Sequence, residues 1–349
     1  MQNLSDIAVI ALGGTIAMTP GGGGGVVPKL TADDLVAAVP GLADVARIHA
    51  STFRQVPGAH LDLHDAVELA GEIERTLETC AGVVVTQGTD TIDEMAYALD
   101  LLVRSPRPVV VTGAMRNPTV AGADGPANLL AAVQTAASAA AVGLGCLVVL
   151  NDEIHAARLV VKGHTARPDA FVSPLGGPLG YVAEGLPRVL LRPVSAPVAL
   201  PGDVAPRPVG LVTAVLGDDG SALRFAAQRS EGVVVEAMGG GHVPPGVADA
   251  VGDVAPTRPV VLASRTHAGE ILRNTYGFPG SERDLLGRGA VSAGWLNARK
   301  ARVLLSLLLG AVSPPDVPAR LAAYLETATR QDPNPTAFAA PDLESRRDG

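Results

Sequence analysis

Short apolar runs alternate with longer amphipathic or alanine-rich stretches through the first 190 residues. The apolar runs predict strands over 7–12, 82–86, 108–112 and 145–150. The stretches between them predict helices over 31–39, 64–80, 91–104 and 125–141. Strands that are apolar throughout and alternate with helices are typical of a parallel sheet covered on both faces. The pattern therefore predicts a doubly wound, mostly parallel α/β domain over residues 1–190.

A second, shorter series of alternating strand-like and helix-like segments follows a proline-rich segment. Residues 191–208 contain five prolines and little periodicity, which is typical of a stiff linker. Beyond it, strands are expected over 209–215, 232–236 and 259–263, and helices over 221–229, 246–252, 298–309 and 317–328. We therefore expect a smaller α/β domain over 209–330, followed by a flexible polar tail over 331–349.

One apolar stretch has the length of a membrane span. Residues 129–150 contain no charged side chain, but two glycines, Gly143 and Gly145, interrupt them. A buried helix followed by a strand fits this pattern better. The first residues also lack a basic region that would begin a signal peptide, so the sequence predicts a cytoplasmic protein.

The composition narrows the class of protein. Apolar residues make up 47% of the chain and charged residues 18%, enough to build a large core. The formal net charge of −8 argues against nucleic acid as a partner. Cys80 and Cys146 both adjoin apolar runs and are expected to be small buried side chains.

Two threonines follow glycines at the ends of predicted strands. Thr15 ends the run Leu12-Gly-Gly-Thr15, and Thr89 stands in Gln87-Gly-Thr89-Asp90. Ligands of open α/β sheets bind beyond the carboxyl ends of the strands, so both hydroxyls are expected to face a substrate. Either segment alone is equally typical of a tight turn with a threonine cap. Both together, with an acid beside the second, favour nucleophilic catalysis with a proton relay.

Residues 21–25 are five consecutive glycines directly after the first of these loops. Such a segment has almost no conformational preference. It is interpreted either as a surface linker or, as we favour, as a mobile lid over the site.

No metal or cofactor is expected. His60, Asp62 and His64 lie close together in the sequence, but no further ligand pattern accompanies them. The glycines before Thr15 lack the three-glycine spacing of a dinucleotide-binding loop.

Several motifs together resemble the bacterial asparaginase and asparaginase/glutaminase family. The resemblance covers about residues 1–325, and the pairing of Gly-Gly-Thr-Ile-Ala with Gly-Thr-Asp-Thr is specific. The motifs are Leu12-Gly-Gly-Thr15-Ile-Ala, Thr86-Gln-Gly-Thr89-Asp90-Thr, Thr112-Gly-Ala-Met-Arg116, Val161-Lys162, Gly177-Pro-Leu-Gly-Tyr181 and Leu296-Asn-Ala-Arg-Lys-Ala-Arg-Val-Leu-Leu305.

The resemblance implies hydrolysis of asparagine to aspartate and ammonia, with possible minor activity on glutamine. Thr15 would attack the amide carbon and form an acyl-enzyme. Thr89, Asp90 and Lys162 would form a relay that activates the nucleophile or the deacylating water. A threonine hydroxyl is a weak nucleophile unless a neighbour accepts its proton, which is the physical need for such a relay.

The resemblance also implies a set of substrate-binding residues. Backbone amides at Gly88, Thr89 and Ala114 would stabilise the oxyanion, and those of Gly58 and Ala59 would bind the α-carboxylate. Asp90 would bind the α-amino group together with Glu282 of a neighbouring subunit. The expected assembly is therefore a homodimer or homotetramer that acts on a small amino-acid amide.

The sequence departs from the family pattern at two places. The family carries a tyrosine in the lid loop, but none of the four tyrosines here (Tyr97, Tyr181, Tyr276 and Tyr324) lies there. The segment 56–60 lacks the serine that the family places near the carboxylate. Two alternatives thus stay open: an amidase for a larger amide, and a weakly active or inactive amino-acid-binding regulatory homologue.

Overall fold

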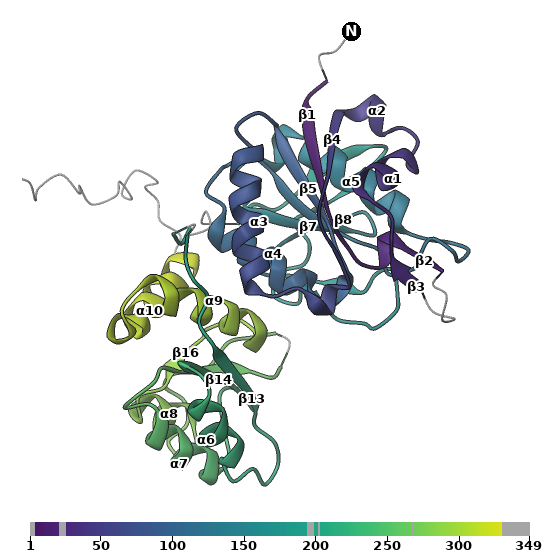
Figure 1. Cartoon of the computed structure of the whole chain (residues 1–349). Helices are drawn as coiled ribbons and strands as arrows, with labels where there is room; N and C mark the ends of the chain where they lie inside the picture. Colours follow the sequence, from purple (N-terminus) through teal and green to yellow (C-terminus); the bar gives the residue numbers. More distant parts are fainter. Residues whose placement is uncertain (1–3, 21–25, 194–198, 202, 267, 330–349) are drawn as a thin grey trace, which may run out of the picture.

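Two α/β bodies, one large and one small, make up the chain (Figure 1). The computed structural model describes residues 4–20, 26–193, 199–201, 203–266 and 268–329. The glycine run at 21–25, part of the proline-rich segment and the tail at 331–349 lie outside the described residues.

An eight-stranded sheet forms the centre of the larger body. Its strand order is β12-β11-β8-β7-β6-β5-β1-β4, and the five strands from β7 to β4 run parallel. The other three join through antiparallel pairs, so the sheet is mostly parallel, as predicted. The strands are β1 (Asp6–Gly13), β4 (Arg47–Val56), β5 (Gly82–Thr86), β6 (Val109–Thr112), β7 (Cys146–Leu150), β8 (Glu153–Ala156), β11 (Gly180–Ala183) and β12 (Leu186–Val189).

Helices cover both faces of this sheet, which confirms the doubly wound prediction. The helices α3 (Leu63–Thr76) and α4 (Ile92–Leu102) share one buried apolar cluster with one face. On the other face lie α1 (Ala32–Ala37), α2 (Leu42–Val45) and α5 (Gly125–Ala136). Short elements at the sheet edge complete the body: η1 (Thr15–Ala17), β2 (Met18–Pro20), β3 (Val26–Pro28), η2 (Gly58–His60), η3 (Thr89–Thr91), η4 (Ala139–Ala141), β9 (Val161–Lys162) and β10 (Phe171–Val172).

The smaller body contains a four-stranded parallel sheet of order β13-β14-β15-β16. One apolar cluster packs α6 and α7 against this sheet, and α9 lies between the sheet and α4 of the larger body. The elements are β13 (Val209–Thr213), α6 (Ser221–Gln228), β14 (Gly232–Ala237), α7 (Pro245–Val254), β15 (Val260–Ser264), α8 (Glu282–Gly287), β16 (Val291–Ser292), α9 (Ala298–Ala311), η5 (Pro314–Asp316) and α10 (Val317–Thr329).

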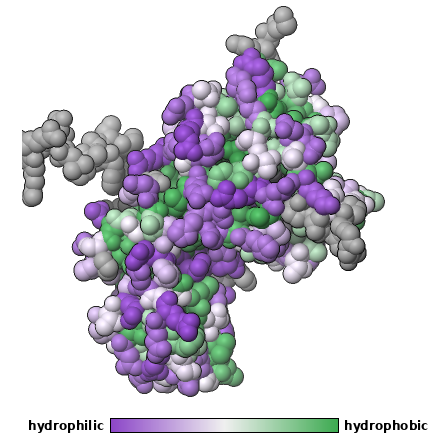
Figure 2. All heavy atoms as spheres, in the orientation of Figure 1, coloured by the Kyte–Doolittle hydropathy of each residue, from purple (hydrophilic) through white to green (hydrophobic). Residues whose placement is uncertain are grey.

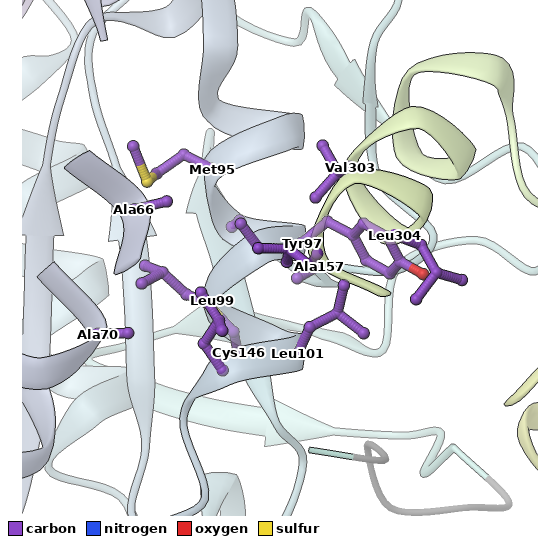
Figure 3. Packing of buried hydrophobic residues seen from close by; sticks show 14 of the residues in the cluster. Ala66, Ala70, Met95, Tyr97, Leu99, Leu101, Cys146, Ala157, Val303 and Leu304 are labelled. Carbon is purple, nitrogen blue, oxygen red and sulfur yellow. The ribbon is translucent and has the colours of Figure 1, made fainter. Parts of the chain in front are cut away.

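The two bodies share part of their core. Tyr97 of α4 and Leu304 of α9 are fully buried in one cluster, and Figure 3 shows them side by side. Burial of a side chain such as Leu304 contributes on the order of 1.5–3 kcal/mol. Figure 2 shows a mainly hydrophilic surface, with hydrophobic residues gathered over β13 and the loop that follows it. Leu211, Val215 and Leu216 are exposed there.

Several sequence expectations about this core are met. The stretch 129–150 folds as α5, a short 3₁₀ turn and β7, although α5 ends at Ala136, earlier than expected. None of the helices in the described part of the chain combines the length and apolar character that a membrane span requires. Cys80 and Cys146 are both buried free thiols.

Candidate active site

Three loops meet where β4, β1 and β5 end, and glycines allow their backbones to touch. Gly13 and Gly14 both have positive φ angles, which side chains seldom adopt. A Cβ atom on Gly14 would lie 2.0 Å from the Gly88 nitrogen, and one on Gly58 would lie 2.7 Å from the Gly88 carbonyl oxygen. These contacts bring the residue before Thr15 against the residue before Thr89.

Lys162 connects with two of the predicted catalytic residues. Its Nζ donates to Thr89 Oγ1 at 3.0 Å and to Asp90 Oδ1 at 2.8 Å. The Thr89 residue is buried, while the Asp90 side chain is 67% exposed and that of Lys162 is 17% exposed. The cluster therefore has a sheltered side at Thr89 and an open side at Asp90, where a charged ligand can approach.

Thr15 begins η1 directly after the two glycines and is half-buried. Among the residues that the structure describes, its hydroxyl group makes no hydrogen bond. This hydroxyl is thus free to contact a ligand, and no described side chain accepts its proton.

Thr91 and Gln87 support the loops, and sequence reasoning missed both. The Thr91 hydroxyl donates to the Gly58 carbonyl oxygen at 2.9 Å. Gln87 Nε2 donates to the Gly88 carbonyl oxygen at 3.3 Å. Thr91 was foreseeable only as the last residue of Gly-Thr-Asp-Thr, since the partner it holds is 33 positions away.

The loop after β6 brings Ala114 to the same edge of the sheet. A Cβ atom on Gly113 would lie 2.6 Å from the Gln87 carbonyl oxygen, so this loop packs directly against the one carrying Thr89. Ala114 is fully buried and Asn128 Nδ2 fixes the Gly113 carbonyl oxygen at 3.0 Å. In the loop after β4, Gly58 is buried and Ala59 is exposed.

Glu282 lies in the smaller body, at the start of α8, and is fully buried. Its Oε1 accepts from the N–H groups of Thr275 and Tyr276 at 2.8 and 2.7 Å. Burial opposes the charged form, but these two N–H groups hold the pKa of Glu282 below its usual value. Its other oxygen lies 3.3 Å from His242 Nε2. Within the described residues of one chain, Glu282 makes no hydrogen bond or ion pair with the threonine loops.

His60 and His64 lie on either side of Asp62, the residue that caps α3. Asp62 caps α3 by accepting from the N–H groups of His64 and Asp65, and both His60 and His64 are exposed. In the part of the chain that the structure describes, no group of three or more candidate ligands surrounds a metal position.

The fold and the site define a two-domain α/β protein whose polar side chains gather at the carboxyl edge of a parallel sheet. Family models extend this assignment over most of the chain. The asparaginase N-terminal model matches residues 6–195, and the glutaminase/asparaginase C-terminal domain model matches residues 208–320. The chain belongs to the asparaginase family.

Similar proteins cover nearly the whole chain. A probable L-asparaginase of Deinococcus radiodurans is 38% identical over 88% of this chain and 94% of its own length. L-asparaginase 2 of Escherichia coli is 35% identical over 89% of this chain and 91% of its own length. The crystal structure of a probable cytoplasmic L-asparaginase from Campylobacter jejuni superimposes with a TM-score of 0.83 at 32% identity, covering 92% of this chain and 99% of that one.

Proposed function

We propose that this protein hydrolyses L-asparagine to aspartate and ammonia through an acyl-enzyme on Thr15. The observation that carries the proposal is the Lys162–Thr89–Asp90 cluster, with Nζ distances of 3.0 and 2.8 Å, beside the loop that carries Thr15. Family membership supports the same reaction, since the similar proteins are named L-asparaginases.

The reaction proceeds in two steps, acylation of Thr15 and deacylation by water. Thr15 Oγ1 bonds to the side-chain amide carbon, the C–N bond breaks, and the leaving nitrogen departs as ammonia with the hydroxyl proton. Water then attacks the ester carbon, which releases aspartate and restores the Thr15 hydroxyl. Backbone N–H groups of Thr89 and Ala114 stabilise the oxyanion of each step, a contribution typically worth about 10²–10³ in rate per donor.

Lys162 transfers the protons in this scheme. Its Nζ, hydrogen-bonded to the Thr89 hydroxyl, exchanges a proton with the reacting groups through that hydroxyl, and Asp90 stabilises the positive charge on Lys162. Because Asp90 is largely exposed, the same carboxylate also binds the α-amino group of the substrate. Backbone amides of Gly58 and Ala59 bind the α-carboxylate at the neighbouring loop.

The proposed assembly is a homodimer or homotetramer in which Glu282 of one subunit completes the site of another. Exposed apolar residues over β13, an edge strand, offer a surface for such association.

A cytoplasmic location belongs to the same proposal and is supported by the description of the Campylobacter jejuni protein. Minor glutaminase activity is supported by the description of the C-terminal family model.

Ammonia release from L-asparagine and L-glutamine tests the function. We expect turnover of asparagine that falls at least about a thousandfold in Thr15→Ala, because the nucleophile is lost. Thr213→Ala is the matched control, since that hydroxyl binds Glu236 in the smaller body. Full turnover in Thr15→Ala would exclude Thr15 as the nucleophile.

A second candidate function is amino-acid binding without catalysis. It is favoured by the absence of a tyrosine from 21–25 and of a serine from 56–60. Calorimetry with aspartate and asparagine separates the two functions. Tight binding of asparagine without ammonia release would favour the binding protein and contradict the enzyme.

A further inference from the structure

Two consecutive residues of the smaller body contact the two chain segments that meet in the Lys162–Thr89–Asp90 cluster. Arg299 and Lys300 lie in the first turn of α9, where Asn297 caps the helix by accepting from the Lys300 N–H at 3.0 Å. The cap fixes where the helix starts and therefore where both side chains project. They belong to the motif Leu296–Leu305, to which the proposed reaction assigns no role.

Lys300 reaches across to the segment that carries Lys162. Its side chain is 1% exposed, and its Nζ donates to the Val160 carbonyl oxygen at 2.5 Å. The same ammonium group lies 5.9 Å from the ring centroid of Tyr97, a residue that Figure 3 shows beside α9. Val160 is two positions before Lys162, so this hydrogen bond fixes the backbone from which Lys162 extends.

Arg299 reaches the segment that carries Asp90. Its Nη2 donates to Asp93 Oδ2 at 2.9 Å, and the Asp93 side chain is 3% exposed. Asp93 stands in the first turn of α4, three residues after Asp90. The start of α4 and the loop with Thr89 and Asp90 are therefore held by the same helix that holds Val160.

The segment around Lys162 lies outside the eight-stranded sheet. β9 has only two residues, and its register pairs Lys162 with Phe171 of β10, outside the eight-stranded sheet. The Val160 N–H donates to the Ala156 carbonyl oxygen at 3.1 Å, and the Val160 carbonyl oxygen accepts from Lys300. Burying an amino group is costly unless it is hydrogen-bonded, and the bond to Val160 offsets that cost.

From these contacts we propose that Arg299 and Lys300 are positioning residues that set the distance between Lys162 and the Thr89–Asp90 pair. Each residue fixes one of the two segments, and the shared backbone of α9 fixes one segment relative to the other. The proposal rests on the proposed function only where it expects a loss of asparaginase activity. That loss is expected because misplacement of a catalytic group by about 1 Å can lower the rate by as much as about 10²-fold.

The lysine content of the chain permits a direct test of this geometry. The protein has three lysines, Lys29, Lys162 and Lys300, so labelled lysine gives three side-chain NMR signals that substitution assigns. The Asp90→Asn variant serves as a reference, because it gives the chemical shift of the Lys162 signal when the Lys162–Asp90 ion pair is lost. The test variants are Lys300→Met and Arg299→Gln. Arg302→Gln is the control on the same helix, because Arg302 Nε donates to Val209 within the smaller body.

We expect the Lys162 signal of both test variants to move toward its position in Asp90→Asn and to stay at the wild-type position in Arg302→Gln. We also expect kcat on asparagine to fall about ten- to a hundredfold while KM changes less than about threefold. A wild-type Lys162 signal in the folded test variants would overturn the proposal.

Two further outcomes are separable. Should Lys300→Met fail to fold, Arg299→Gln decides, because the Arg299 side chain is 40% exposed and tolerates substitution. Should the wild-type protein release no ammonia, the proposed function fails, yet the Lys162 signal still supports or overturns the positioning role.

Discussion

Three glycines set the distance of closest approach between the loops that carry Thr15 and Thr89. Gly58 is the most instructive of them, because its φ angle is one that alanine adopts and only space forbids a side chain. A Cβ atom there would lie 2.7 Å from the Gly88 carbonyl oxygen and 3.0 Å from Gly88 Cα. Backbone cannot yield as a flexible side chain does, so the loops would separate.

We therefore predict that Gly58→Ala lowers kcat/KM on asparagine by at least about tenfold and destabilises the protein by about 1–3 kcal/mol. Urea unfolding and ammonia release measure the two effects. Gly176→Ala is the matched control, since a Cβ atom there meets nothing within 4 Å, and its stability should change little or rise slightly. Equal behaviour of the two variants would show that the glycine contacts are unimportant.

At the scale of elements, α9 joins the second sheet to α4, and its buried charge links stability to pH. Burial lowers the pKa of Lys300 to about 7, against the opposing effects of Asp93 and Asp100 and with the help of Arg299. An unfolded lysine titrates near pH 10.4, so between these values the unfolded chain binds more protons than the folded one. Stability therefore rises with pH in this window.

We predict that the free energy of unfolding of the wild-type protein rises by up to about 1.4 kcal/mol per pH unit relative to Lys300→Met between pH 7.5 and 9.5. Urea unfolding of both proteins at several pH values measures the difference. The window stops short of pH 10 because an unfolded lysine begins to lose its own proton there, and the difference then levels off. The raised pKa values of the buried Tyr97 and Tyr324 affect both proteins alike and cancel in this comparison. Parallel curves for the two proteins would contradict the prediction.

The sequence predicts best the elements whose pattern is set locally. The strands β1, β5, β6 and β7 each contain a short buried apolar run, and a glycine or a polar residue marks where that run ends. β4 was missed because its ten residues alternate between half-buried and exposed positions at the edge of the sheet. α8 was missed because it is only six residues long.

The site residues also divide into those that local sequence indicates and those that only the fold brings together. Thr15, Thr89 and Asp90 were foreseeable as strand-end residues, whereas Lys162 was selected by its resemblance to a family motif. Its hydrogen bonds to Thr89 and Asp90 span 73 and 72 positions, and no local pattern encodes such a contact. Lys300 was noted only as part of the motif Leu296–Leu305, and its 1% exposure results from the packing of α9 against α4.

At the scale of the whole molecule, the proposal that Glu282 of one chain completes the site of another can be tested by mixing variants. The Glu282 carboxylate binds the backbone of its own loop at Thr275 and Tyr276, so Glu282→Gln keeps an acceptor for those N–H groups and removes the charge. If a site combines Thr15 of one chain with Glu282 of another, two inactive variants complement each other. In a random mixture of Thr15→Ala and Glu282→Gln chains, about a quarter of the sites receive both natural residues.

We therefore predict that unfolding and refolding these two variants together restores about a quarter of wild-type activity, because subunits exchange and mixed assemblies form. Separate refolding followed by mixing at once should restore little, since the subunits have not exchanged. Thr15→Ala mixed with Thr89→Ala is the control: both residues lie on loops of one body that glycine contacts bring together, so no mixed assembly rebuilds a complete site. No recovery in the test mixture would place Glu282 outside the shared site and leave its carboxylate a purely structural ligand of its loop, whereas recovery in the control would contradict a site that takes Thr15 and Thr89 from the same chain.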